Sequence, residues 1–557
     1  MSGRQSLEGP AAVGARVPAM GGDAWTRGGD ASFVSGSRTI SARRFAPALG
    51  LRGLALVLLC AVGALLFGSP SAHAATCPPI KNKPQQVPHV DYTGMQHLTY
   101  CYGPVSVKPG QNIIRVNSTN LFPSVPGYIT RFDPELIYAN GTVPRVDVLH
   151  LHHAVWAVNG ANPQFATGEE KTIFQMPRGF GWRSQPSDIW FLNDMIHDLV
   201  GKPATVYIVW RLDFVPDSVA AADSIKRVRT RWMDVSGPSP RVGISSGIYP
   251  VFNALRGMGG GGRYTFPDDA TGGQHNLIGP SQSWTPDHPV TLVGTAGHLH
   301  PGGLNTSLRV DRGSQRKTLF TSRAHYWEPA GAVSWDVAMG ATPDDWRVKL
   351  HSGDKLSVHA TYDTKSADWY EVMGIMPVAV YDGTDAGGVG PFSKQLDKQE
   401  VLTHGHLYEN RNHGGKPTFL PDPTKLTAVS PHSPIGIEDY KYEQGDLAGI
   451  GAANRPPRIH AGQTLTFLNN DAAQSTNTFH TITSCKEPCN RSTGIAYPIA
   501  NGPRTFDSGQ LGFNYAGYNA PAANRDTWTT PSNLKPGDYS YFCRVHPFMR
   551  GSFRVVK

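Results

Sequence analysis

The residues with the clearest chemical potential lie near the C-terminus, spaced as Cys543-x-x-His546-x-x-Met549. A blue-copper centre needs one thiolate and two imidazoles in a near-trigonal plane, with a weak axial thioether. This loop supplies three of those four ligands. His480 is the candidate for the fourth, because residues 478–483 are expected to form a strand facing the loop. The four residues predict a type 1 copper site; the alternative is a buried cysteine beside an unrelated histidine and methionine.

On the basis of these motifs, residues 431–557 resemble the cupredoxin family, and the ligand loop is most similar to that of amicyanins. The resemblance implies a Greek-key β-sandwich that binds one type 1 copper and transfers single electrons. The ligand set that it implies is His480, Cys543, His546 and Met549.

A second group of histidines occupies the β-branched stretch 146–158, which carries His150, His152 and His153. On a regular strand His150 and His152 share one face and His153 points away. A bulge or strand end would let the adjacent pair converge. The alternative is that these are hydrogen-bonded histidines of a sandwich core. His197 lies further on, in residues 188–199, where we expect a short helical or irregular segment.

A third group follows the apolar stretch that begins at residue 289 and consists of His298 and His300. Two histidines at i and i+2 on a strand point the same way and can chelate one metal ion. Met373 lies in a later strand, and its thioether would suit Cu(I) if it met this pair. The alternative for Met373 is a filler of the apolar core.

Residues 95–382 resemble the copper type II, ascorbate-dependent monooxygenases, the group of the peptidylglycine and dopamine enzymes. The matching elements are Thr99-Tyr100-Cys101, His152-His153, His298-x-His300 and a methionine after a strand. The resemblance implies two jelly-roll-like β-sandwiches with one copper each. It places the first copper on His152, His153 and His197 and the second on His298, His300 and Met373.

The chain also departs from that family at two places. The strand 205–214, where the family has a third histidine for its first copper, contains none, so His197 is the substitute. Ala296 stands where the peptide-amidating members have an arginine that binds the substrate carboxylate, which argues against a peptide carboxylate substrate.

The N-terminal region has the features of an export signal. Residues 53–67 are apolar, follow Arg43, Arg44 and Arg52, and precede an A-x-A cleavage site at 72–74. A membrane span would need about 20 apolar residues, so a signal peptide is the better interpretation. We therefore expect a secreted, periplasmic or cell-surface protein with no membrane span once residues 1–74 are removed.

Six cysteines are present, of which Cys60 lies in the signal region and Cys543 is assigned to copper. An even remainder in an exported chain favours disulfides. Proximity favours the pairs Cys77–Cys101 and Cys485–Cys489. A Cys-x-x-x-Cys metal clip is the alternative for the second pair.

Charge and composition exclude several classes of function. The net charge is +8, of which the first 74 residues carry +4, and no Lys/Arg-rich run suggests nucleic-acid binding.

The 61 glycines and 45 prolines, with little 3.6-residue periodicity, favour a β-rich chain. We therefore predict an all-β protein: an extension and signal peptide (1–74), two jelly-roll-like sandwiches (75–215 and 216–382), a linker with a histidine cluster at His404, His406 and His413 (383–430), and a cupredoxin sandwich (431–557).

Together these features predict an exported copper-binding oxidoreductase, in which the cupredoxin part exchanges single electrons with a two-copper, monooxygenase-like module. Expected partners are a redox protein or a small reductant, with oxygen as a further candidate. The alternative is a non-catalytic blue-copper electron-transfer or copper-binding protein. A multicopper oxidase is disfavoured, because Cys543 is flanked by Phe542 and Arg544 rather than by the histidines that would join it to a trinuclear cluster.

Overall fold

β-Strands make up most of the regular structure, which confirms the prediction of an all-β chain over the described residues. The computed structural model describes residues 77–557 except for 83–88, 109–113, 147, 161–162, 199–201, 236–250, 272–282, 328–331, 333–334, 366, 408–419, 475–478, 486–504, 514–524, 545 and 547–548. The predicted signal region and cleavage site, Cys489 and His413 lie outside these residues. The helices are short: η1 (Ala220–Ser224), η3 (Lys394–Leu396), η5 (Pro423–Lys425) and α3 (Asp471–Gln474).

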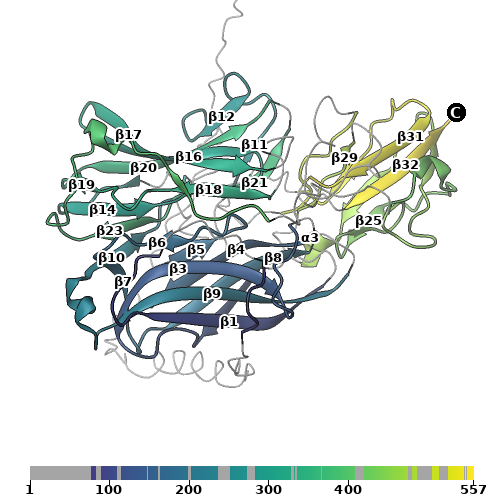
Figure 1. Cartoon of the computed structure of the whole chain (residues 1–557). Coiled ribbons are helices and arrows are strands. Elements are labelled where there is room, and N and C mark those ends of the chain that lie inside the picture. The colour runs from purple at the N-terminus through teal and green to yellow at the C-terminus, as the bar shows by residue number, and fades with distance from the viewer. Residues whose placement is uncertain are drawn as a thin grey trace, which may run out of the picture. The chain divides into compact units, whose positions relative to one another are not determined.

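The largest sheet in the described part has nine strands and combines segments that are far apart in the sequence. Its order is β1 (Gln96–Val107), β9 (Ala204–Pro216), β3 (Gly127–Tyr138), β7 (Phe180–Ser184), β10 (Lys226–Arg231), β23 (Val378–Tyr381), β14 (Val290–Thr295) and β19 (Val348–Leu350), with β6 (Phe174–Gln175) beside β3. Figure 1 shows β1, β9 and β3 side by side. The parallel pairing of β7 with β10 carries this sheet across the boundary expected at 215/216.

A second sheet carries the first histidine group. Its order is β2 (Ile114–Thr119), β8 (Trp190–Asp198), β4 (Leu149–Val158) and β5 (Pro163–Thr167). One core cluster joins residues of this sheet with residues of the nine-stranded sheet, and includes Phe132, Trp156, Trp190 and Trp210. Large aromatic side chains bury much apolar area each, so this layer is a rigid support for β4 and β8.

The prediction of a helical or irregular segment at residues 188–199 is wrong for most of its length, because the structure has a strand, β8, at Trp190–Asp198. It pairs with β4 in antiparallel register over its whole length. The sequence WFLNDMIHD mixes apolar and polar residues without clear period-2 alternation, so tertiary pairing decides its conformation.

A third sheet carries the part of the chain that follows β14. Its order is β12 (Arg263–Phe266), β20 (Lys355–Asp363), β16 (Gly303–Arg312), β17 (Gln315–Tyr326), β18 (Val337–Ala341) and β24 (Val401–Leu402), with β13 (Ser283–Trp284) beside β20. Two short pairs complete this region: β11 (Phe252–Ala254) with β21 (Trp369–Val372), and β15 (His298–Leu299) with β22 (Gly374–Ile375).

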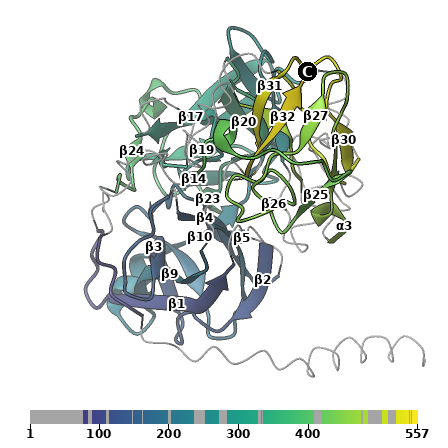
Figure 2. The ribbon, with the colours of Figure 1, turned by 90° about the vertical axis from the view of Figure 1, so that its right-hand side faces the viewer.

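The C-terminal part consists of two four-stranded sheets. One has the order β26 (Lys441–Tyr442), β25 (Ile435–Glu438), β28 (Thr466–Asn469) and β30 (Thr527–Thr529). The other has the order β27 (Arg458–His460), β32 (Arg550–Val556), β31 (Gly537–Phe542) and β29 (Thr483–Ser484). Figure 2 shows β31, β32 and β27 side by side. A core that includes Phe467, Tyr541 and Phe553 joins the two sheets.

The cysteines follow the prediction where the structure describes them. Cys77 and Cys101 form a disulfide, which ties the N-terminal segment to β1. Cys485 is also disulfide-bonded, whereas Cys543 is a free, buried thiol. Among the described residues no helix has both the length and the apolar character that crossing a membrane requires.

Candidate metal centres

The first candidate centre is a triangle formed by Cys543 with His480 and His546. Cys543 Sγ lies 3.8 Å from Nδ1 of each imidazole, and the two Nδ1 atoms are 3.2 Å apart. Bond lengths of about 2.3 Å to a thiolate and about 2.0 Å to an imidazole place such ligand atoms about 3.7 Å apart in a trigonal plane. All three residues are buried. The spacing fits one metal ion held by two nitrogens and one sulfur, and a free cysteine in contact with an unrelated histidine would not require this convergence.

The loop that follows β31 folds back so that Cys543, His546 and Met549 belong to one turn. The backbone N–H of Met549 donates to the carbonyl of His546 at 2.9 Å, and that of Cys543 donates to the carbonyl of Met549 at 3.1 Å. The Cys543 sulfur accepts backbone N–H groups of Thr481 and His546, each at 3.3 Å. Donors aimed at the sulfur favour the thiolate, which is the form that binds metal. Met549 is buried beside this group in the same core cluster as Cys543.

Asp471 at the start of α3 orients one of the imidazoles. Its carboxylate lies 2.8 Å from Nε2 of His480, so Nε2 carries the proton and Nδ1 faces Cys543. Burial alone would lower the pKa of His480, but its hydrogen bonds with Asp471 and Cys543 outweigh burial and raise the pKa to about 9. A carboxylate behind a metal-binding histidine fixes its tautomer and increases its basicity.

The second candidate centre is a cluster of buried imidazoles on β4 and β8. His150, His152 and His197 have ligand nitrogens within 4.8 Å of one another. His150 and His197 are direct cross-strand partners, and His152 is the residue that has no partner in the register, at the bulge between Leu151 and His153. The rings of His152 and His197 stack with centroids 4.3 Å apart. Burial lowers the pKa of His150 to about 3 and holds those of His152 and His197 well below their usual range. The cluster is therefore neutral at physiological pH, as metal binding requires.

A bulge in β4 sets this arrangement. The pairing register with β8 shifts between Leu151 and His153. The N–H of Leu151 donates instead to the carboxylate of Glu169 at 3.0 Å. Glu169 in turn pairs with the buried ammonium group of Lys171, at 3.1 Å, and Lys171 also pairs with Glu135 at 2.8 Å. This buried ionic network fixes the point at which β4 changes register, and so fixes which histidines share a face.

His300 and Trp335 complete the imidazole cluster. The centroid of the His300 ring lies 4.7 Å from that of His152, and the Trp335 ring lies 4.9 Å from His150 and 5.0 Å from His300. Among the residues that the structure describes, His152 Nδ1, His197 Nε2 and His300 Nε2 are buried without a hydrogen-bond partner. Such nitrogens are costly to bury unless a further ligand satisfies them. Converging neutral imidazoles with these nitrogens fit a copper ion.

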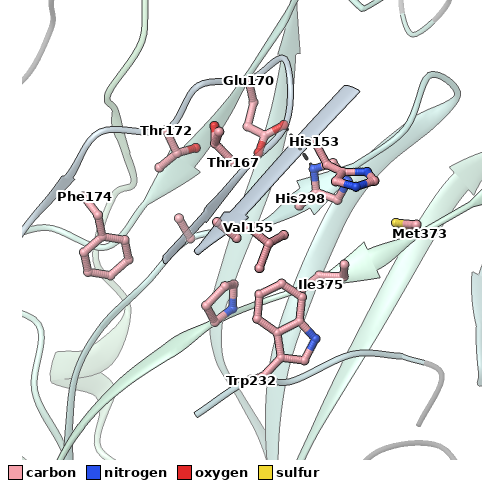
Figure 3. Close-up of a pocket in the computed structure, with 14 residues that line it drawn as sticks. His153, Val155, Thr167, Glu170, Thr172, Phe174, Trp232, His298, Met373 and Ile375 are labelled. Carbon is pink, nitrogen blue, oxygen red and sulfur yellow. Dashed lines mark hydrogen bonds and ion pairs between the residues drawn. The ribbon is translucent and has the colours of Figure 1, made fainter. Parts of the chain in front are cut away.

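The third candidate centre is an apolar pocket that contains His153, His298 and Met373 (Figure 3). Nδ1 of His298 lies 3.1 Å from the carboxylate of Glu170, and Nε2 of His153 lies 2.9 Å from the amide oxygen of Asn193. Burial lowers the pKa of His153 to about 4, and His298 contributes to that shift because it is close by. The rest of the pocket is mostly apolar, with Val155, Phe174, Trp232 and Ile375 among its walls. Two imidazoles and a thioether in apolar surroundings are a soft ligand set that suits Cu(I).

The structure brings the sequence-predicted histidines close together across both expected groups. His152 and His197 lie together as expected, with His150 beside them, and the His153 ring is 5.7 Å from that of His152. His298 and Met373 line one pocket as expected, together with His153, and the His300 ring is 5.4 Å from that of His298 and 4.7 Å from that of His152. His480, Cys543 and His546 converge as the sequence predicted.

Several residues that shape these centres had no clear signal in the sequence. Three of them are recognisable only by where the fold places them, because aspartate and glutamate are common at the surface and tryptophan is common in a core. These are Asp471, Glu170 and Trp335. The sequence does indicate His150, because the alternation of side chains along a strand predicts that it shares a face with His152. In the expected linker, His406 stacks on Trp327 and lies 3.1 Å from Asp336. His404 is buried.

Comparison with known proteins gives short similarities only. No protein-family model and no curated protein matches the sequence. Among solved structures, the reduced Cu(I) form of an amicyanin mutant at pH 4 shares 18% identity over 25% of this chain and 91% of its own, with a TM-score of 0.13. Amicyanin from Paracoccus versutus shares 17% identity over 25% and 89%, with a TM-score of 0.12. A purple cupredoxin from Nitrosopumilus maritimus shares 23% identity over 18% and 75%, with a TM-score of 0.11. Structural similarities with TM-scores this low carry no argument about the metal centres. The assignment of each centre therefore depends on the residues of this chain that form it.

Proposed function

We propose that this protein is an exported copper protein whose C-terminal part is a type 1 copper cupredoxin that exchanges single electrons. The observation that carries the proposal is the triangle of Cys543 Sγ with the Nδ1 atoms of His480 and His546, at 3.8, 3.8 and 3.2 Å. Met549 on the same loop would supply a thioether as a fourth, weaker ligand.

The residues around the triangle suit one-electron chemistry. Bound copper would supply the Cu(II)/Cu(I) couple. The chain supplies a thiolate that accepts two backbone N–H groups, and an imidazole whose tautomer Asp471 fixes. All of these groups are buried, so little of the ligand set needs to reorganise and water is excluded. A site that is rigid in this way favours electron transfer over ligand exchange.

We further propose two additional coppers in residues 95–382. One is held by His150, His152 and His197, with His300 as a further imidazole. The other is held by His153, His298 and Met373. The first set is all nitrogen and the second contains a thioether, so the second copper should be the more strongly biased toward Cu(I). These two ligand sets group the histidines by their positions in the structure rather than by their order in the sequence.

Two functions remain candidates for the complete protein. The apolar pocket beside His153, His298 and Met373 favours a copper-dependent monooxygenase or related oxidoreductase, because a small organic substrate could lie next to a copper there. The alternative is a blue-copper electron-transfer or copper-binding protein without turnover. A redox protein or small reductant would supply electrons in either case, and oxygen would be consumed only in the first.

The decisive experiment combines copper counting with oxygen uptake on the mature, full-length protein. We expect one copper for each of the three ligand sets, and ascorbate-driven oxygen uptake if the protein is an oxidoreductase. A fully loaded protein that holds a single copper would refute the two additional centres. Full loading without oxygen uptake would favour the electron-transfer alternative. Secreted protein that begins near Ala75 would support export, and retention in the cytoplasm would refute it.

A further inference from the structure

The blue-copper triangle is buried against another part of the same chain. His546 is only 3% exposed. Phe542, which precedes Cys543, belongs to the same core cluster as Phe252 of β11 and Trp369 of β21. An electron-transfer centre that served an external partner would be expected to present one ligand edge at the surface. Here the edge of His546 is covered.

Buried polar contacts hold this junction between the copper loop and β11–β21. Arg544, adjacent to the copper thiolate, is 3.4 Å from Asp368 and 3.2 Å from Asp507. Asn253 of β11 donates to the side-chain oxygen of Gln510 at 3.2 Å. Buried, specific contacts of this kind determine register more than they add stability.

The junction leads from the triangle to the imidazole cluster. Asn253 also accepts the backbone N–H of Glu371 at 3.1 Å. A hydrogen bond joins the backbone of Glu371 to the ring of His300. Glu371 adopts a left-handed backbone with φ of 53°. A non-glycine residue keeps that conformation only where its surroundings require it.

The hydrogen bond to His300 leads into the rest of the imidazole cluster. The ring of His300 is 4.7 Å from that of His152, which stacks on His197. The junction therefore ends in this cluster.

We propose that the imidazole cluster is the electron partner of the blue-copper site, with Asn253 and Glu371 linking the junction beside the copper loop to His300. This inference rests on the proposed function. One electron would pass from a copper held by His480, Cys543 and His546, which would be oxidised from Cu(I) to Cu(II), to a copper held by the imidazole cluster, which would be reduced from Cu(II) to Cu(I). No bond forms or breaks. Asp368, Arg544 and Asn253 are positioning residues that hold the two sites together.

The test uses the full-length, copper-loaded protein without oxygen. A brief reducing pulse bleaches the blue band, and its recovery reports the electron leaving the thiolate site. We expect a recovery rate that does not depend on protein concentration. His197→Ala with His300→Ala should keep the blue band and abolish this recovery. Asp368→Asn should keep the copper of the thiolate site and that of the imidazole cluster. It should slow the recovery of the blue band about tenfold, which corresponds to an increase of roughly 1.4 kcal/mol in the activation free energy. Asp382→Asn, at an exposed pair with Arg229, is the matched control and should change nothing.

A second readout needs no copper. In metal-free protein His546 should resist an imidazole-modifying reagent, because the junction covers it. If Asp368→Asn does not fold, Asn253→Ala takes its place as the variant that opens the junction, and it should make His546 reactive. Recovery proportional to protein concentration, equal recovery without His197 and His300, or a reactive His546 in the wild type would overturn the inference. These results would leave the proposed type 1 copper site intact, because that site is refuted only if the blue band itself is absent.

Discussion

Nε2 of His480 lies 2.8 Å from a carboxylate oxygen of Asp471, and both groups are buried. The same carboxylate accepts the backbone N–H groups of Asp439 at 2.8 Å and Tyr440 at 3.1 Å. Tyr440 in turn packs edge-on against the rings of both His480 and His546. One aspartate therefore fixes the tautomer of a copper ligand and the loop that covers it.

Asp471→Asn should weaken copper binding at the thiolate site by about 10- to 100-fold, as loss of a group behind a metal-binding histidine does. The amide can still accept a hydrogen bond but carries no charge. A competition titration with a copper chelator measures the change. Asp538→Asn is the control, because Asp538 pairs with Arg554 away from the centre. Equal affinity in both variants would show that Asp471 does not support His480.

The His480–Asp471 pair should also make the metal-free protein less stable at alkaline pH. The pKa of His480 is raised from 6.5 in the unfolded chain to about 9 in the folded one. The stabilisation is therefore fully present below about pH 6.5 and is lost as the pH rises through 9, amounting to roughly 3 kcal/mol. Denaturant unfolding in a chelator at pH 6 and pH 9.5 measures it. Asp471→Asn should remove most of this dependence, and a wild type that is equally stable at both values would contradict the assignment.

The copper loop could be predicted because its ligands are close in sequence and their types match one chemistry. His480 could be added because only one histidine lies on the strand expected to face that loop. The grouping of the other histidines could not be predicted in the same way. His152 and His153 lie at the bulge of β4 with their rings 5.7 Å apart, but His152 also stacks on His197 across the strand pair, whereas His153 lies beside Asn193.

The β-rich class followed from composition, whereas the sheets did not. The pairing of β7 with β10 joins segments that a sequence-based division at 215/216 separates, because strand pairing depends on the whole fold and not on the local pattern. Asp471, Glu170 and Trp335 could not be identified, since nothing in their neighbourhood distinguishes them from ordinary surface or core residues.

His150→Ala and His153→Ala should affect different coppers. His150→Ala should remove the copper of the all-imidazole cluster, and His153→Ala that of the pocket with Met373. Copper counting with electron paramagnetic resonance distinguishes the two, because a nitrogen-only site and a site with a thioether give different Cu(II) signals. His406→Ala, which removes a histidine stacked on Trp327, is the control and should keep every copper. Loss of the same signal in both variants would restore the sequence-based pairing of His152 with His153.

The Cys77–Cys101 disulfide should stabilise the fold without touching the centres. It closes a loop with a sequence separation of 24. Replacing both cysteines by serine should lower the free energy of unfolding by about 3 kcal/mol, the loss expected for a loop of this length. Thermal or denaturant unfolding measures the loss, and copper content should be unchanged. An unchanged stability would show that the N-terminal segment contributes nothing to the fold.

The measurement that tests the central claim most directly is the visible spectrum of the full-length protein loaded with Cu(II). A thiolate bound to Cu(II) with two imidazoles should give an intense band at about 600 nm. Cys543→Ala should abolish the band, whereas Met549→Leu should keep it and raise the reduction potential, because an axial donor to Cu(II) is lost. A fully loaded wild type without this band, or a Cys543→Ala protein that retains it, would contradict the assignment of the type 1 copper site.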